Sequence, residues 1–176
     1  MESIFIAFTG VHGSGKTTGV NNLAAKLRAN GKKVIVIKEG ARKYEGDLNT
    51  FTAQDWVWEY KLNQEAMACG TDVDYIIGDR TIMDLLMYYR YMLIYGCNEP
   101  TTIEGMEVWA FRMLTAENMM SRYDHIIRMP LNLEWLQSPD PLRNPGVYYA
   151  MIIDKLFDRY VEQYVNTAPG YFEEIV

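Results

Sequence analysis

The chain has 176 residues, enough for one domain over residues 1–176 with a hydrophobic core that needs no disulfide bonds or metal ions. Hydrophobic residues make up 49% and charged residues 23%, as in folded globular proteins. The net charge of −6 disfavours a broad nucleic-acid surface and favours small-molecule partners. Cys69 and Cys97 have the spacing of neither a zinc site nor a disulfide framework, and the amino terminus resembles no signal peptide or membrane span. We expect a cytoplasmic protein.

Short apolar strands and helices are expected to alternate along the chain. Strands are expected at 3–8, 33–38, 73–77 and 125–129, helices at 16–30, 50–69, 81–95, 103–121 and 147–166, and a short closing strand at 171–176. The second strand, 33–38, is an unbroken β-branched run, typical of a parallel strand covered on both faces. The pattern predicts a three-layer α/β/α fold with a short, mostly parallel sheet and a ligand crevice at the carboxyl ends of its strands.

A glycine-rich loop joins the first strand to the first helix. Residues 10–17, Gly-Val-His-Gly-Ser-Gly-Lys-Thr, fit the phosphate-binding pattern in which glycines turn successive backbone N–H groups toward phosphate oxygens. Lys16 is expected to reach the terminal phosphates and Thr17 to bind Mg²⁺, while a local contact is favoured for His12. The expected nucleotide-binding residues are Gly10, His12, Gly13, Ser14, Gly15, Lys16, Thr17 and Thr18.

Charged residues follow the next two strands, where both strand ends face the same crevice. Glu39 with Arg42 follows the second strand, and Asp79 with Arg80 follows the third. Asp79 would hold the water shell of Mg²⁺, Glu39 would orient or deprotonate a hydroxyl, and the arginines would bind phosphate charge. In the alternative interpretation Glu39 and Arg42 form a surface ion pair, and Asp79 caps the following helix.

An aromatic cluster at the start of the second helix is the candidate acceptor-binding region. It comprises Phe51, Gln54, Trp56, Trp58 and Tyr60. Its rings could stack a base while the Gln54 amide reads the base edge, and Trp58 is the ring assigned to substrate binding. The alternative, favoured for Trp56 and Tyr60 individually, is packing between helix and sheet.

These motifs resemble the nucleoside and nucleotide kinase branch of the P-loop NTPases. The likeness is to thymidylate kinases, deoxynucleoside kinases and the AAA ATPase/kinase family that includes the ribosylnicotinamide kinase domain. It rests on Gly10 to Thr18, Glu39 with Arg42, Asp79-Arg80-Thr81, and Arg143 at the position of a lid arginine in a small lid at about 131–146. The resemblance implies ATP, Mg²⁺ and transfer of the γ-phosphoryl group to a small acceptor.

The expected site can be stated by role. The catalytic residues would be Lys16, Glu39, Asp79, Arg80 and Arg143, the substrate-binding residues Glu39, Arg42, Gln54, Trp58 and Arg80, and the metal-binding residues Thr17 and Asp79. Lys38-Glu39-Gly40 departs from the Arg-Glu-Pro of typical thymidylate kinases, and the lid has one clear arginine. A nucleoside and a nucleoside monophosphate therefore both stay open as acceptor.

Two alternative functions also stay open. One is phosphorylation of a hydroxyl on nucleic acid, at a modified base or a 5′ end. The other is a nucleotide-controlled ATPase or interaction module, although the chain lacks the Asn-Lys-x-Asp base reader of guanine-selective switches. The tyrosine-rich helix after Arg80 is compatible with a homodimer face.

Overall fold

The structure is a computed structural model that describes residues 3–96, 103–136 and 146–167. Its sheet consists of β1 (Ile4–Thr9), β2 (Val34–Ile37), β3 (Tyr75–Asp79) and β4 (His125–Arg128). The helices are α1 (Lys16–Ala29), α2 (Phe51–Cys69), α3 (Ile82–Tyr95), α4 (Ile103–Met120), α5 (Leu133–Leu136) and α6 (Val147–Tyr160), with 3₁₀ turns η1 (Gly40–Lys43) and η2 (Glu162–Tyr164). All strand pairs are parallel, in the order β2-β3-β1-β4.

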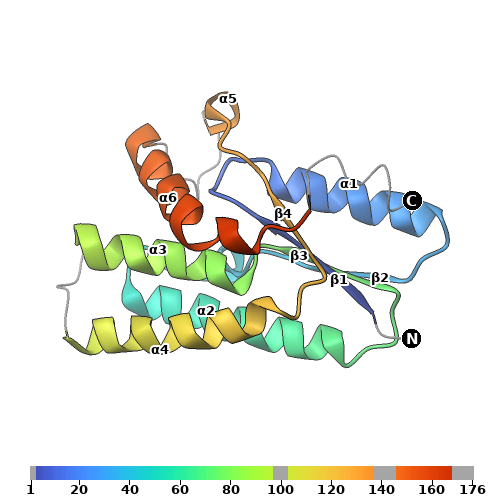
Figure 1. Ribbon diagram of the computed structural model, residues 1–176, viewed down its shortest axis with the longest axis horizontal. Helices are drawn as coiled ribbons and strands as arrows, with labels where there is room; N and C mark the ends of the chain where they lie inside the picture. Colours follow the sequence, from blue (N-terminus) through green and yellow to red (C-terminus); the bar gives the residue numbers. More distant parts are fainter. Residues whose placement is uncertain (1–2, 97–102, 137–145, 168–176) are drawn as a thin grey trace.

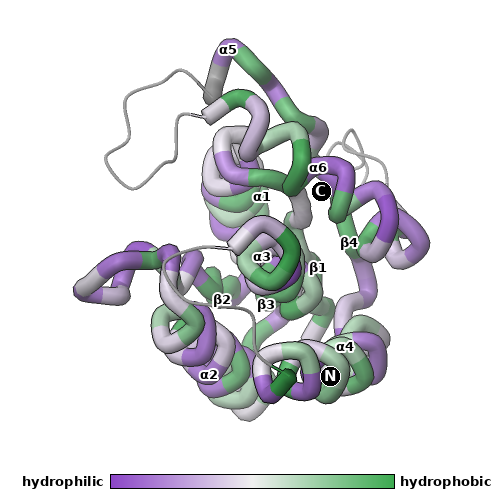
Figure 2. The backbone as a smooth tube through the Cα atoms, turned by 90° about the vertical axis from the view of Figure 1, so that its left-hand side faces the viewer, coloured by the Kyte–Doolittle hydropathy of each residue, from purple (hydrophilic) through white to green (hydrophobic). Residues whose placement is uncertain are grey.

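Helices cover both faces of the sheet, which confirms the expected α/β class. Alternate side chains of β1 point to opposite faces. Ile6 and Phe8 belong to the cluster formed with α1, whereas Phe5 and Ala7 belong to the cluster formed with α2, α3, α4 and α6. Figure 1 shows α1 on one side of the strands and α2 and α4 on the other, and Figure 2 shows the apolar strands between these layers.

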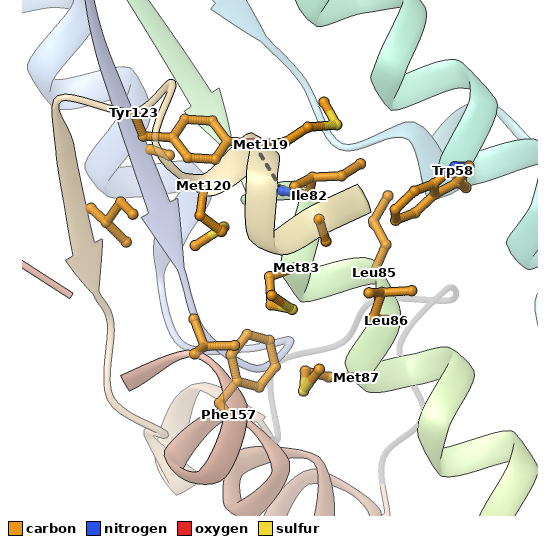
Figure 3. Packing of buried hydrophobic residues seen from close by; sticks show 14 of the residues in the cluster. Trp58, Ile82, Met83, Leu85, Leu86, Met87, Met119, Met120, Tyr123 and Phe157 are labelled. Carbon is orange, nitrogen blue, oxygen red and sulfur yellow. Dashed lines mark hydrogen bonds between the residues drawn. The ribbon is translucent and has the colours of Figure 1, made fainter. Parts of the chain in front are cut away.

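The cluster that Phe5 and Ala7 form with α2, α3, α4 and α6 is the larger of the two. Figure 3 shows Met83 and Met87 of α3 beside Phe157 of α6, and none of the three is accessible to solvent. Complete burial of such side chains contributes roughly 1.5–3 kcal/mol each through the hydrophobic effect. This packing holds α3 against α6.

Two elements differ from expectation by more than one residue at a boundary. β3 was expected at 73–77 but spans Tyr75–Asp79, because Gly78 and Asp79 continue the pairing with Ala7 and Phe8 of β1. The last helix was expected to reach residue 166, but α6 ends at Tyr160 and is followed by η2. The short helix α5, within the expected lid, was not anticipated from the sequence.

Some expectations lie outside the described residues. These are the closing strand at 171–176 and most of the lid, including Arg143. Thr167 forms a parallel bridge with Ile127 of β4. None of the described helices is long and apolar enough to cross a membrane.

Candidate active site

The glycine loop lies between the end of β1 and the start of α1. Gly10 has a φ of +144°, and a Cβ at this position would come within 2.4 Å of the Met129 carbonyl oxygen after β4. Gly13 and Gly15 also have positive φ values, of 76° and 86°. The loop thus has the backbone freedom that phosphate binding requires, and it leads directly into the amino terminus of α1, whose dipole favours an anion.

Lys16 is buried inside this loop. Its Nζ donates hydrogen bonds to the Val11 carbonyl oxygen at 2.7 Å and to Ser14 Oγ at 3.3 Å. Burial, followed by repulsion from Arg80, lowers the pKa of Lys16 to about 7. An anion in the loop would stabilise the charged form. Thr17 and Thr18 are exposed at the start of α1.

Thr17 and Asp79 connect α1 with the end of β3. Thr17 Oγ1 donates a hydrogen bond to Asp79 Oδ2 at 2.6 Å. The other oxygen, Asp79 Oδ1, is buried and receives no hydrogen bond from any described residue. A hydroxyl beside an unsatisfied buried carboxylate oxygen is a donor set that suits Mg²⁺ and its water ligands. The helix-capping alternative for Asp79 is wrong, because the Thr81 side chain caps α3 by accepting from Asp84 N–H.

Arg80 and Glu39 form an ion pair between the ends of β3 and β2. Arg80 Nε donates to Glu39 Oε1 at 2.7 Å, and Nη2 lies 2.6 Å from the same oxygen. Arg42 Nε lies 3.7 Å from Glu39 Oε2, so Arg80 is the closer partner. Burial by itself would raise the pKa of Glu39, but the charges of Arg80 and Lys16 outweigh it and hold that pKa below its ordinary value. Glu39 is therefore a carboxylate at neutral pH.

Tyr88 of α3 links this ion pair to the glycine loop. Its hydroxyl accepts hydrogen bonds from Arg80 Nη1 at 3.2 Å and from the His12 backbone N–H at 3.0 Å. The His12 ring lies 5.2 Å from the ring of Tyr149, near the start of α6. The local contact expected for His12 is therefore present, and it joins the loop to two helices. In Figure 1 this end of the sheet faces α6.

The aromatic residues of α2 lie in two different environments, one exposed and one buried. Trp56 stacks on Tyr60 at 5.1 Å and is 38% exposed, whereas Trp58 is 4% exposed. The Arg112 guanidinium lies 5.2 Å from the centre of the Trp58 ring. Gln54 Nε2 donates to the Leu48 carbonyl oxygen at 2.8 Å. In the structure the Gln54 side chain is hydrogen-bonded to Leu48, and the Trp58 ring is covered by Arg112. A substrate role for Gln54 and Trp58 therefore stays a proposal.

Sequence reasoning missed several buried polar residues behind the site. Asp84 accepts hydrogen bonds from Thr9 at 2.6 Å and from Thr81 at 2.5 Å, and burial raises its pKa. Lys61 and Glu65 form a buried ion pair on α2 at 3.2 Å. The Thr-x-x-Asp spacing from residue 81 was a detectable capping signal. Lys61 and Glu65, by contrast, have the spacing of an ordinary surface pair on a helix.

Among the described residues, no group of three or more His, Cys, Asp and Glu side chains could hold a metal ion.

The chain is similar to a known protein family and to solved structures. A family model described as an AAA domain matches residues 5–168. No curated protein matches the sequence. Among 171 matching chains of solved structures is deoxyadenosine kinase from M. mycoides with bound dATP. It has a TM-score of 0.60 and 18% identity over 91% of this chain and 84% of that chain.

Proposed function

Because the chain belongs to the AAA-domain family of P-loop NTPases, we propose that it transfers the γ-phosphoryl group of ATP to a nucleoside or a nucleoside monophosphate. The observation that carries the proposal is the Arg80–Glu39 ion pair across from the glycine loop. A nucleotide-binding module needs no such pair, whereas a kinase needs a carboxylate for the incoming hydroxyl and a cation for phosphate charge. The shared fold with deoxyadenosine kinase agrees with a nucleoside acceptor.

The donor half of the proposed site is the glycine loop. Its backbone N–H groups would bind the phosphates, with Lys16 at the terminal ones and Thr18 beside them. Thr17 and Asp79 would hold Mg²⁺, since the unsatisfied Asp79 Oδ1 suits its water shell. The ion, when bound, neutralises charge on the phosphate oxygens.

The acceptor half is formed by the two charged strand ends. Glu39 Oε1 is occupied by Arg80, so Oε2 is the oxygen that we assign to the substrate hydroxyl. There it orients the hydroxyl for in-line attack and accepts its proton as the new O–P bond forms. Arg80 stabilises the charge that develops on the transferred group. Arg42 is half exposed and would bind an acceptor phosphate if one is present. Arg143 is proposed to close over the phosphates, and Gln54 and Trp58 to line the base.

The experiment that tests this proposal is an acceptor screen with γ-labelled ATP and with γ-labelled GTP. Nucleosides, nucleoside monophosphates and oligonucleotides are offered separately, and the labelled product is identified. A labelled nucleotide product supports the proposal. Label on an oligonucleotide would instead assign the activity to nucleic acid, and release of phosphate without any acceptor product would favour the ATPase or interaction module. A Lys16→Met variant controls for contaminating kinases, because it removes the loop cation.

A further inference from the structure

Arg80 has an unusual backbone conformation. Its φ of +93° is the only positive value among the described residues other than glycine. Such a conformation is costly for a residue with a Cβ and persists only where surrounding contacts hold it. Arg80 also carries the side chain that binds Glu39, so whatever holds its backbone also sets the direction of that side chain.

A chain of buried polar contacts from α2 and the α4–β4 turn reaches this backbone. Lys61 Nζ donates to the Arg80 carbonyl oxygen at 2.6 Å and pairs with Glu65 at 3.2 Å. Tyr123 Oη donates to Glu65 Oε1 at 2.6 Å and accepts the Ile82 backbone N–H at 2.9 Å. Figure 3 shows this last bond as a dashed line. The contacts therefore hold the backbone on both sides of Thr81.

The packing leaves room for the Lys61 ammonium beneath the turn. A Cβ at Gly78 would lie 3.2 Å from the Arg80 carbonyl oxygen and 3.4 Å from Lys61 Nζ. Lys61 is 3% exposed and Glu65 is fully buried. Because residue 78 is a glycine, the Lys61 ammonium and the Arg80 carbonyl group can both pack closely against this point of β3.

Stability alone does not account for this ion pair. A buried ion pair commonly contributes no more to stability than apolar side chains of similar volume. In addition, Glu65 Oε2 is buried without a hydrogen bond from any described residue. What an apolar pair could not supply is a donor at the Arg80 carbonyl oxygen.

We propose that Lys61, Glu65 and Tyr123 are positioning residues that hold the Asp79-Arg80-Thr81 turn so that Arg80 is directed at Glu39. The effect of these residues on turnover rests on the proposed kinase function. Their effect on the position of the Arg80 side chain does not depend on that function. Lys61 fixes the carbonyl side of the turn, Tyr123 fixes the N–H side, and Glu65 orients both groups.

The geometric test is NMR of the arginine Nε–H groups in the full chain. The Arg80 signal is assigned by its loss in Arg80→Lys and is expected to exchange slowly, because this N–H donates to Glu39. The test variant is Lys61→Met combined with Glu65→Gln, which removes both charges and retains an acceptor for Tyr123. Accelerated exchange or loss of the Arg80 signal in this variant is the expected result. An unchanged signal would overturn the proposal.

Two further variants keep the test decisive. Tyr123→Phe removes one hydroxyl and keeps the ring, so it serves if the double variant does not fold, and faster exchange of Arg80 Nε–H is again expected. Val57→Ala, also on α2 and buried, is the control for lost packing, and in it the Arg80 signal should stay protected. Loss of the signal in Val57→Ala to the same degree would show a general loosening and count against positioning.

The kinetic test follows once an acceptor is known. The double variant should lose about tenfold in kcat with little change in the KM for ATP. In an Arg80→Ala background the same changes should cost almost nothing more, because groups that act through one another are not additive. Full additivity would overturn the proposal. Absence of transfer by the wild-type protein would refute the kinase function and leave the NMR result to decide the positioning claim.

Discussion

Thr17 at the start of α1 donates a hydrogen bond of 2.6 Å to Asp79 at the end of β3, 62 positions later in the chain. The bond brings the hydroxyl of the glycine loop to a carboxylate whose other oxygen is buried and unsatisfied within the described structure. Two residues assigned to Mg²⁺ separately from the sequence are therefore in direct contact.

Asp79→Asn is expected to weaken Mg²⁺ binding while preserving the fold, since an amide oxygen can still accept from Thr17. We expect kcat to fall between about 10- and 100-fold, and the Mg²⁺ concentration for half-maximal rate to rise by a similar factor. The measurement is phosphoryl transfer as a function of Mg²⁺. Asp72→Asn, an exposed aspartate that pairs with Lys33 before the amino end of β3, is the comparison variant, and it should leave the Mg²⁺ dependence unchanged. An unaltered Mg²⁺ dependence in Asp79→Asn would contradict the assignment.

Lys16→Met should abolish transfer without destabilising the protein. Burial lowers the pKa of Lys16, and among the described residues its ammonium donates to the Val11 carbonyl and the Ser14 hydroxyl rather than to a carboxylate, so an apolar side chain removes a desolvation penalty. We expect at least an about 100-fold loss of kcat/KM and an unchanged or higher free energy of unfolding. Kinetics and denaturant unfolding provide the two readouts. A large loss of stability would mean that Lys16 is primarily structural.

Glu39→Gln tests the carboxylate and its pH dependence. A loss of about 100-fold or more in kcat is expected, with little change in ATP binding. Because the pKa of Glu39 is lowered, its ion pair contributes stability above the ordinary glutamate pKa of about 4.3 and loses it as pH falls through the lower folded value.

Two pH measurements test the lowered pKa of Glu39. The acid limb of the wild-type kcat/KM profile that belongs to Glu39 should lie below about pH 4.3 and be absent from Glu39→Gln. The stability difference between the two proteins should stay constant above that pH and shrink below it. A limb near neutral pH would assign the titration to another group, and unchanged turnover of the variant would refute the role of Glu39 as base.

Arg42→Ala distinguishes the two acceptor classes. Arg42 is half exposed and its Nε lies 3.7 Å from Glu39, so it is placed to bind an additional phosphate. With a monophosphate acceptor the KM should rise about tenfold or more, the loss of one charge-assisted contact, whereas a nucleoside should show little change. Lys43→Ala, the next residue and also exposed, is the matched control. Equal effects of both variants would indicate general electrostatics rather than a specific contact.

Gly10→Ala is expected to disrupt the glycine loop through a direct clash. The added Cβ would lie 2.4 Å from the Met129 carbonyl oxygen, so the loop or the chain after β4 must move. We expect a loss of about 1–3 kcal/mol in unfolding free energy together with weaker nucleotide binding. In Gly31→Ala the alanine must also adopt a positive φ, of 77°, but its Cβ would have no neighbour within 4 Å. It should therefore cost less stability and leave nucleotide binding intact.

The sequence by itself determined the α/β class and the place of the glycine loop, which we assign to the donor half of the proposed site. The glycine loop is a local feature, because eight successive residues, 10–17, and the flanking strand and helix specify it together. Glu39 and Asp79 could be expected at one edge of the sheet for a different reason, since parallel strands bring their carboxyl ends to one edge whatever the details of packing. The strand and helix positions followed from runs of apolar residues, although boundaries such as the end of α6 depended on local turns.

Only the tertiary structure decided how these groups are paired. Glu39 pairs more closely with Arg80, 41 positions away, than with its neighbour Arg42, because β2 and β3 are adjacent in the sheet. Lys61 and Glu65 look like a surface pair in the sequence, yet α2 turns them inward beneath the Arg80 turn. Helical spacing specifies which residues share a face, but whether that face meets water or the core depends on contacts between segments far apart in the chain.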